Sequence, residues 1–376
     1  MTISASPPAA LEPAGTDTGA IALAELIRDA RAVGPRLSRR NGEDAISVAG
    51  LCKKYPDGTQ AVQGMSFRVA AGESFGILGP NGAGKSTTIG MLGTLVRPTS
   101  GDLEVAGFDV VEDAKEVRRR IGFATQQAGT DDFATATESL ILQGRLQGMA
   151  KREAAARARL LLRIMDLEDV AERRLGALSG GIKRRVDLAA SLVHLPPILF
   201  LDEPTEGLDP RVRASVWGTL TELRRELGIT IVLTTHFMEE ADRLCERIGL
   251  INRGSLVAEG TPEALKTTVG DQALVIDLGT ESSPEDVARA RQAVSAHESA
   301  RRTLVTDRQI SIFTDDSAAL APQALRLLEL AGLTTRSVSI TKPTLEDVYL
   351  HYTGRAFDDE RAMDLKLAGD ELERAA

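Results

Sequence analysis

The chain has 376 residues, a hydrophobic fraction of 43%, an aromatic fraction of 3% and a formal net charge of -9. This length predicts two domains plus tails, and the excess of acidic side chains with few aromatic ones argues against nucleic acid as a partner. The sequence lacks both a run of about 18 apolar residues and a basic-then-apolar start, so neither a membrane-spanning helix nor a secretion signal is expected. Cys52 and Cys245 lie far apart and outside any CxxC pair, which favours free thiols.

Residues 1–44 are rich in Ala, Pro, Gly and Thr and are predicted to be a flexible, mostly disordered extension. Within them Leu23, Leu26, Ile27 and Ala30 share one helical face, so a short amphipathic helix is an alternative for that stretch. From Ala45 the composition changes to alternating apolar runs, which predicts that a first folded domain spans residues 45–270.

A phosphate-binding loop is the strongest motif in this domain. It fits the pattern G-x-x-x-x-G-K-[ST] and consists of Gly79, Pro80, Asn81, Gly82, Ala83, Gly84, Lys85, Ser86 and Thr87. An apolar strand, 75–78, precedes it and a helix is expected over 87–95. The glycines allow the backbone N–H groups to surround phosphates, Lys85 can reach the β- and γ-phosphates, and the Ser86 hydroxyl can bind Mg²⁺. A glycine-rich turn without a ligand is the ordinary alternative.

The rest of the domain alternates strands with helices. Strands are expected at 45–48, 63–69, 103–105, 121–124, 198–201 and 229–235, and helices at 151–166, 183–193 and 211–227. Strands that are apolar on both faces indicate a parallel sheet covered by helices, so the predicted fold class is α/β.

A second domain is predicted over residues 271–342. Its order is strand 273–278, helix 284–296, strands 302–306 and 309–314, helix 318–331 and strand 335–341, which is the ferredoxin-like βαββαβ order of a small α+β domain. Residues 343–376 are expected to form an amphipathic helix that begins near Thr344, followed by a charged tail.

Two further segments carry chemistry. The buried strand 198–201 ends in Asp202 and Glu203, where Asp202 suits a Mg²⁺ ion beside the phosphate loop and Glu203 is placed to polarise a water molecule. The segment Leu178-Ser179-Gly180-Gly181 opens a helix and offers a second anion site, although an ordinary helix cap at Ser179 explains it equally well.

Four single residues have ordinary interpretations when each is taken alone. Tyr55 fits a surface aromatic, Gln126 and His236 fit structural residues at strand ends, and Asp209 fits a turn. In this order along the chain, however, these residues and the three motifs resemble the ATP-binding cassette over about residues 45–268. The resemblance implies a phosphate-loop NTPase domain with a mostly parallel sheet, an antiparallel β-subdomain and a helical subdomain.

The resemblance also implies a role for each matching residue. Tyr55 corresponds to the aromatic that stacks on adenine, Gln126 to the glutamine that touches Mg²⁺, and Asp202 to the Mg²⁺ aspartate. Glu203 corresponds to the catalytic glutamate and His236 to the histidine that contacts the γ-phosphate. Ser179, Gly180 and Gly181 correspond to the signature that covers ATP bound to an opposite subunit, and Asp209 to a residue that crosses the dimer interface. The implied ligands are ATP and Mg²⁺.

The sequence departs from the family pattern at Ile182, where glutamine is usual, and at Glu206, whose charge is expected to raise the pKa of Glu203. The closing segment 343–355 resembles the daunorubicin-resistance branch of export ATPases. This branch implies a second copy of the chain and an integral membrane permease of ABC-2 type as partners, at the cytoplasmic face of the membrane, with efflux of a drug, antibiotic or lipid-like compound. A soluble ATPase of translation or DNA repair and an importer ATPase are the alternatives.

Overall fold

The computed structural model describes residues 16–33, 44–126, 131–279, 281–306 and 308–354. The chain forms two compact units. Unit 1 comprises Met1–Arg39, Gly122–Leu199 and Thr205–Ile229, and unit 2 comprises Arg40–Ile121, Phe200–Pro204 and Thr230–Ala376. Among the helices within the described ranges, none combines the length and apolar character needed to cross a lipid bilayer. Both cysteines are free, as expected.

A mixed sheet carries the phosphate loop. Its strand order is β10-β9-β3-β8-β7-β6, and β3 pairs in parallel with both β8 and β9 while β10 pairs antiparallel with β9. The strands are β3 (Ser74–Leu78), β6 (Ile121–Ala124), β7 (Ile198–Asp202), β8 (Thr230–Thr235), β9 (Arg247–Asn252) and β10 (Ser255–Gly260). Every residue of β3, β7 and β8 is buried, which fits strands covered on both faces and confirms the predicted α/β class.

Unit 2 also contains an antiparallel sheet of order β2-β1-β4-β5, formed by β1 (Asp44–Lys54), β2 (Gln60–Ala70), β4 (Ser100–Val105) and β5 (Phe108–Asp109). The same unit contains the helices α2 (Lys85–Leu92), α3 (Ala114–Arg118), α8 (Met238–Leu244) and α9 (Pro262–Thr267). Unit 1 is largely helical, with α4 (Ala136–Leu146), α5 (Lys151–Ile164), α6 (Gly180–Leu192), α7 (Pro210–Leu227) and the 3-10 turns η1 (Glu168–Val170) and η2 (Leu175–Ala177). Together they match the antiparallel and helical subdomains expected for an ATP-binding cassette.

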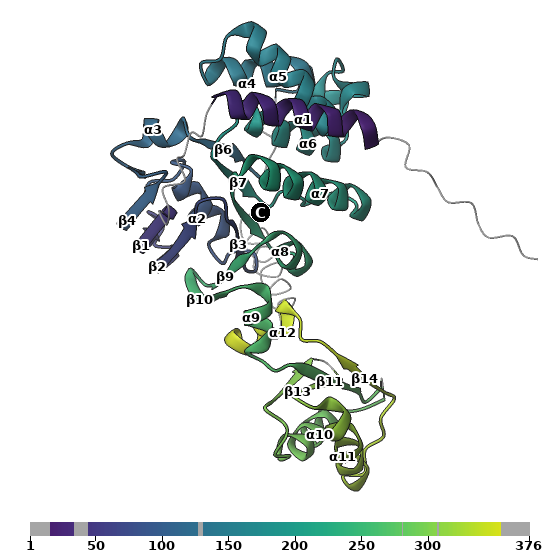
Figure 1. Cartoon of the computed structure of the whole chain (residues 1–376). Helices are drawn as coiled ribbons and strands as arrows, with labels where there is room; N and C mark the ends of the chain where they lie inside the picture. The colour runs from purple at the N-terminus through teal and green to yellow at the C-terminus, as the bar shows by residue number, and fades with distance from the viewer. Residues whose placement is uncertain (1–15, 34–43, 127–130, 280, 307, 355–376) are drawn as a thin grey trace, which may run out of the picture. The chain divides into compact units, whose positions relative to one another are not determined.

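The prediction of disorder over residues 1–44 is wrong for residues 16–33, which form helix α1 (Thr16–Val33). The alternative, an amphipathic helix, is the one found. α1 contacts α5 and α7 within unit 1 (Figure 1), and Leu23 and Leu26 are buried. The short apolar face did not outweigh the disorder-prone composition in the sequence analysis. The helix forms because its apolar face packs on other helices, and tertiary packing of this kind supplies most of a helix's stability. Residues 1–15 and 34–43 lie outside the described residues.

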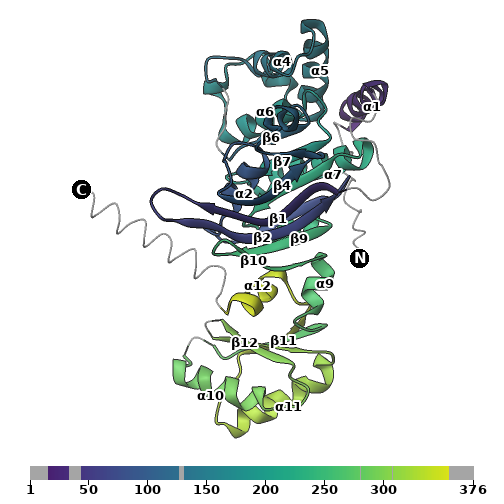
Figure 2. The ribbon, with the colours of Figure 1, turned by 90° about the vertical axis from the view of Figure 1, so that its left-hand side faces the viewer.

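The C-terminal part of unit 2 has the element order predicted from the sequence. It contains β11 (Gln272–Asp277), α10 (Pro284–Ser295), β12 (Arg302–Thr306), β13 (Gln309–Thr314), α11 (Ser317–Leu330) and β14 (Ser337–Thr341). The strands form an antiparallel sheet of order β12-β13-β11-β14, and α10 and α11 pack on one face of it (Figure 2). The core of this sheet contains Leu274, Ile276, Ile310, Ile312 and Leu328. The name ferredoxin-like and the domain boundaries stay predictions.

Helix α12 (Leu345–Thr353) begins where the sequence predicts. Thr344 and Asp347 form a capping box in which each side chain accepts a hydrogen bond from the other residue's backbone N–H. Leu345, Val348 and Tyr349 are buried, and the helix contacts α8, α9, β10 and β12. The expected charged tail, from residue 355 onward, lies outside the described residues.

Candidate active site

The phosphate loop lies between β3 and α2 and depends on its glycines. Gly82 and Gly84 have φ angles of 75° and 100°, in the left-handed region that other residues rarely adopt. A Cβ atom at Gly84 would lie 2.3 Å from the Ala61 carbonyl oxygen, and one at Gly79 would lie 2.5 Å from that of Ile251. The loop is therefore closely surrounded by backbone, and its curled path requires glycine at these positions.

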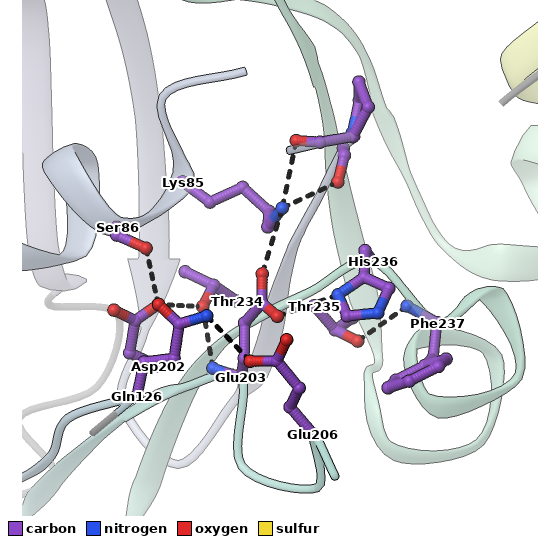
Figure 3. A network of polar contacts seen from close by, with 12 residues as sticks. Lys85, Ser86, Gln126, Asp202, Glu203, Glu206, Thr234, Thr235, His236 and Phe237 are labelled. Atoms are coloured by element: carbon purple, nitrogen blue, oxygen red, sulfur yellow. Dashed lines mark hydrogen bonds and ion pairs between the residues drawn. The ribbon is translucent and has the colours of Figure 1, made fainter. Parts of the chain in front are cut away.

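Lys85 is the first residue of α2 and is 4% exposed. Its Nζ donates to the carbonyl oxygens of Gly79 at 2.9 Å and Pro80 at 3.0 Å, and lies 3.1 Å from Oε1 of Glu203 (Figure 3). The ammonium group is thus held at the mouth of the loop, next to the glutamate predicted to be catalytic.

Asp202 ends strand β7 and accepts hydrogen bonds from two hydroxyl groups. Its Oδ1 accepts a hydrogen bond from Ser86 Oγ at 3.1 Å and from Thr234 Oγ1 at 2.5 Å (Figure 3). Burial raises the pKa of this carboxyl group, although the two hydrogen bonds oppose the rise. Carboxylate and hydroxyl oxygens are the donors that Mg²⁺ prefers, and a cation here would offset the cost of burying the charge. The residues present therefore fit a magnesium ion.

Glu203 follows with a strained backbone, φ 47°. Its N–H donates to the carbonyl oxygen of Thr234 at 3.1 Å and to Thr234 Oγ1 at 3.0 Å, which holds this conformation. Oε2 of Glu203 lies 2.8 Å from Nδ1 of His236. Burial alone raises the pKa of Glu203, but the hydrogen bond with His236 and the charge of Lys85 outweigh it and bring the pKa to about 2. The rise expected from Glu206 is therefore wrong.

Tyr55 and the remaining loop residues lie close to this centre within unit 2. The Tyr55 hydroxyl is 3.3 Å from Thr87 Oγ1, and Lys53 Nζ lies 5.0 Å from the centre of the tyrosine ring. Asn81 is exposed, whereas Ala83 is buried. Tyr55 therefore lies beside Thr87 at the end of the phosphate loop, in a position to contact the base of a nucleotide.

The other predicted residues belong to unit 1. Gln126 donates from Nε2 to Oε2 of Glu206 at 2.7 Å. Asp209 caps α7, because its Oδ1 accepts from the backbone N–H groups of Arg211 and Val212. Ser179 and Gly180 are exposed at the start of α6, and the Ser179 side chain makes no capping hydrogen bond. The signature thus has an open surface, while Asp209 has the helix-cap contacts expected of its ordinary interpretation.

Thr234 is the residue that the sequence analysis missed. Its hydroxyl contacts both Asp202 and the backbone of Glu203, so it connects the two acidic residues. The sequence signal for it is weak, because strand 229–235 contains three threonines, Thr230, Thr234 and Thr235, and the sequence does not distinguish Thr234 from the other two. Strand pairing between β7 and β8 creates the contact, and a single sequence does not reveal strand pairing.

The chain is similar to known proteins of one family. Residues 62–206 match the family model described as ABC transporter. The daunorubicin resistance ATP-binding protein DrrA3 of Streptomyces coeruleorubidus is 42% identical over 85% of this chain and 98% of its own length. The Nod factor export ATP-binding protein I of Burkholderia lata is 40% identical over 84% of this chain and 98% of its own.

A solved structure extends the comparison to three dimensions. The ATP-binding cassette MJ0796, in a dimeric post-hydrolysis state bound to ADP and Pi, is 31% identical with a TM-score of 0.54 and covers 57% of this chain and 98% of its own. The curated relatives cover most of the chain. The chain therefore belongs to the ABC transporter family of ATP-binding proteins.

Proposed function

We propose that this protein is the ATPase subunit of an ABC exporter and that two copies of it enclose two ATP molecules. The observation that carries the proposal is the convergence of Lys85, Glu203 and His236 at the mouth of the phosphate loop. Dimeric cassette structures and relatives named for resistance and export support it over the translation, DNA-repair and import alternatives.

In the proposed site the loop from Gly79 to Thr87 binds the phosphates and Tyr55 contacts the base. Glu203, ionised at neutral pH, accepts the hydrogen bond of a water molecule aimed at the γ-phosphate and acts as its general base. His236 holds the Glu203 carboxylate in place and contacts the same phosphate. Asp202 and Ser86, with Gln126, would hold a Mg²⁺ ion, and such an ion would supply positive charge beside the phosphate oxygens.

The segment Ser179-Gly180-Gly181, whose first two residues are exposed, would complete the site of the opposite subunit. Free N–H groups at the start of α6 are suited to an oxyanion, and Gly180 has open space around its Cα. Asp209 would lie at the interface. The γ-phosphate contacts both subunits only in the closed dimer, so ATP binds the closed dimer more tightly than the open one. Hydrolysis removes the γ-phosphate and with it this difference in affinity.

Transport requires a partner, and we infer that it is an integral membrane permease of ABC-2 type bound on the cytoplasmic side of the membrane. The relatives are named as ATP-binding proteins of resistance and export. The exported compound would be a drug, an antibiotic or a lipid-like molecule. The segment that follows Gln126 is proposed to contact the permease; residues 127–130 of it lie outside the described residues.

A complementation experiment tests the composite site. Lys85→Ala removes the phosphate contact of one subunit, and Ser179→Arg obstructs the surface offered to the other. Each variant alone should lack ATPase activity, but a mixture contains heterodimers with one intact site and should recover phosphate release. Thermal unfolding of each variant controls for folding. A mixture as inactive as its components would overturn the proposal that two subunits share each site.

A further inference from the structure

A cavity of about 450 Å³ lies in the C-terminal part of unit 2, at the outer edge of its sheet. We call it the β12 cavity; it is lined by Arg291, Ser295, Ala300, Arg301, Arg302, Thr303, Leu304, Val305, Leu350 and Gly354. β12 is the edge strand, with α10 and α12 as its neighbouring helices (Figure 2). All of these elements belong to one compact unit and are separate in sequence from the phosphate loop.

The charge of the β12 cavity is one-sided. Arg291, Arg301 and Arg302 line it, and no acidic residue does among the residues described there. Arg301 pairs with Asp315, which balances its charge, so the positive charge that remains comes from Arg291 and Arg302. The cavity therefore retains a net positive charge in a protein whose overall charge is -9.

The guanidinium group of Arg302 is fixed in position by neutral partners. Its Nη1 lies 2.5 Å from Nδ1 of His351, and its Nη2 donates to the carbonyl oxygen of His351 at 3.0 Å. Burial and the charge of Arg302 both lower the pKa of His351, which keeps the imidazole an acceptor. Among the described residues Arg302 has no carboxylate partner, and an oriented guanidinium of this kind is suited to bind an oxyanion from a ligand.

Thr303 adds a polar group that lacks a partner. Its Oγ1 is buried and has no hydrogen-bond partner among the described residues, and the residue lines the same cavity. Leu304, Val305 and Leu350 contribute apolar surface. The volume falls in the range of small-molecule sites and exceeds what a single inorganic ion needs.

We propose that the β12 cavity binds a small organic molecule that carries a phosphate group. A phosphate monoester, with a charge of about -1.5 to -2, matches Arg291 and Arg302 better than a single carboxylate does, since neither arginine pairs with a carboxylate within the described part of the chain. The apolar wall would contact the organic part, and Arg302 would bind two phosphate oxygens. The phosphate could belong to a soluble metabolite or to a lipid headgroup, and the chemistry at the arginines is the same.

The test uses the full chain in a Lys85→Ala background, so that the phosphate loop contributes little. Glycerol 3-phosphate, with glycerol as a blank, is titrated by calorimetry, and vesicles of phosphatidylcholine with or without phosphatidic acid are tested by co-sedimentation. Arg291→Glu and Arg302→Ala should weaken binding at least about tenfold, the value of one charge-assisted hydrogen bond. Arg326→Ala removes an exposed arginine of α11 outside the cavity and should leave the affinity unchanged.

The outcomes separate clearly. Binding of glycerol 3-phosphate that depends on Arg291 and Arg302 supports a soluble ligand, and the same dependence seen with phosphatidic acid vesicles alone supports a lipid headgroup. Arg291 is exposed, so Arg291→Glu should fold even if Arg302→Ala does not, and Arg291→Lys should retain most of the affinity. No binding of either probe, or an equal loss in Arg326→Ala, would overturn the proposal.

Discussion

Lys85 Nζ and Glu203 Oε1 lie 3.1 Å apart, and both side chains are almost fully buried, at 4% and 5% exposure. The pair joins the residue proposed to bind the terminal phosphates to the residue proposed to activate water. Each charge lowers the cost of burying the other, so the two residues act as one electrostatic unit. His236 shares the same carboxylate through its other oxygen.

Glu203→Gln should bind ATP but hydrolyse it at least ~10²-fold more slowly, because an amide cannot accept a proton from water. The change keeps the shape of the side chain, so the loop and Lys85 still hold the phosphates. Phosphate release measures the rate and a fluorescent ATP analogue measures binding. Turnover close to that of the unchanged chain would exclude Glu203 as the general base.

The pKa of Glu203 predicts how stability depends on pH. Because the pKa falls from 4.5 to about 2 on folding, the ionised form stabilises the fold above pH 4.5, and this stabilisation disappears as the pH falls toward 2. The difference in unfolding free energy between the unchanged chain and Glu203→Gln should therefore shrink over that window, by roughly 3 kcal/mol at most. Urea titrations across the window measure it, and a constant difference would contradict the lowered pKa.

Thr234→Val should raise the Mg²⁺ concentration needed for half-maximal ATPase activity by about 10- to 100-fold, because the variant lacks the hydroxyl that orients Asp202. It should also lower the unfolding free energy by about 1–3 kcal/mol. Thr235→Val is the matched control, since Thr235 is equally buried in β8 but accepts from the N–H of Phe237. A similar change in Mg²⁺ dependence in both variants would refute the role of Thr234.

Local sequence patterns predict the phosphate loop, the acidic end of β7 and the element order of the C-terminal part, because spacing and apolar periodicity determine them. They do not predict contacts such as Gln126 with Glu206, which are 80 residues apart and depend on how the chain folds back. Helix α4 was missed although Thr135 and Glu138 form a capping box that the sequence contains. Strand β9 was missed because its apolar run is short and interrupted by Gly249.

Helix α1 gives the last prediction. Leu26 is fully buried and Ile21, on the same helix, is 51% exposed. Because α1 packs on α5 and α7, Leu26→Ala removes a core side chain and should lower the unfolding free energy by about 2–5 kcal/mol. Ile21→Ala should change the unfolding free energy little. Arg157, which lies 3.6 Å from Asp29 of α1, should then become accessible in Leu26→Ala. Hydrogen exchange of α5 and chemical denaturation measure both effects, and equal stability of the two variants would mean that α1 contributes nothing to the fold.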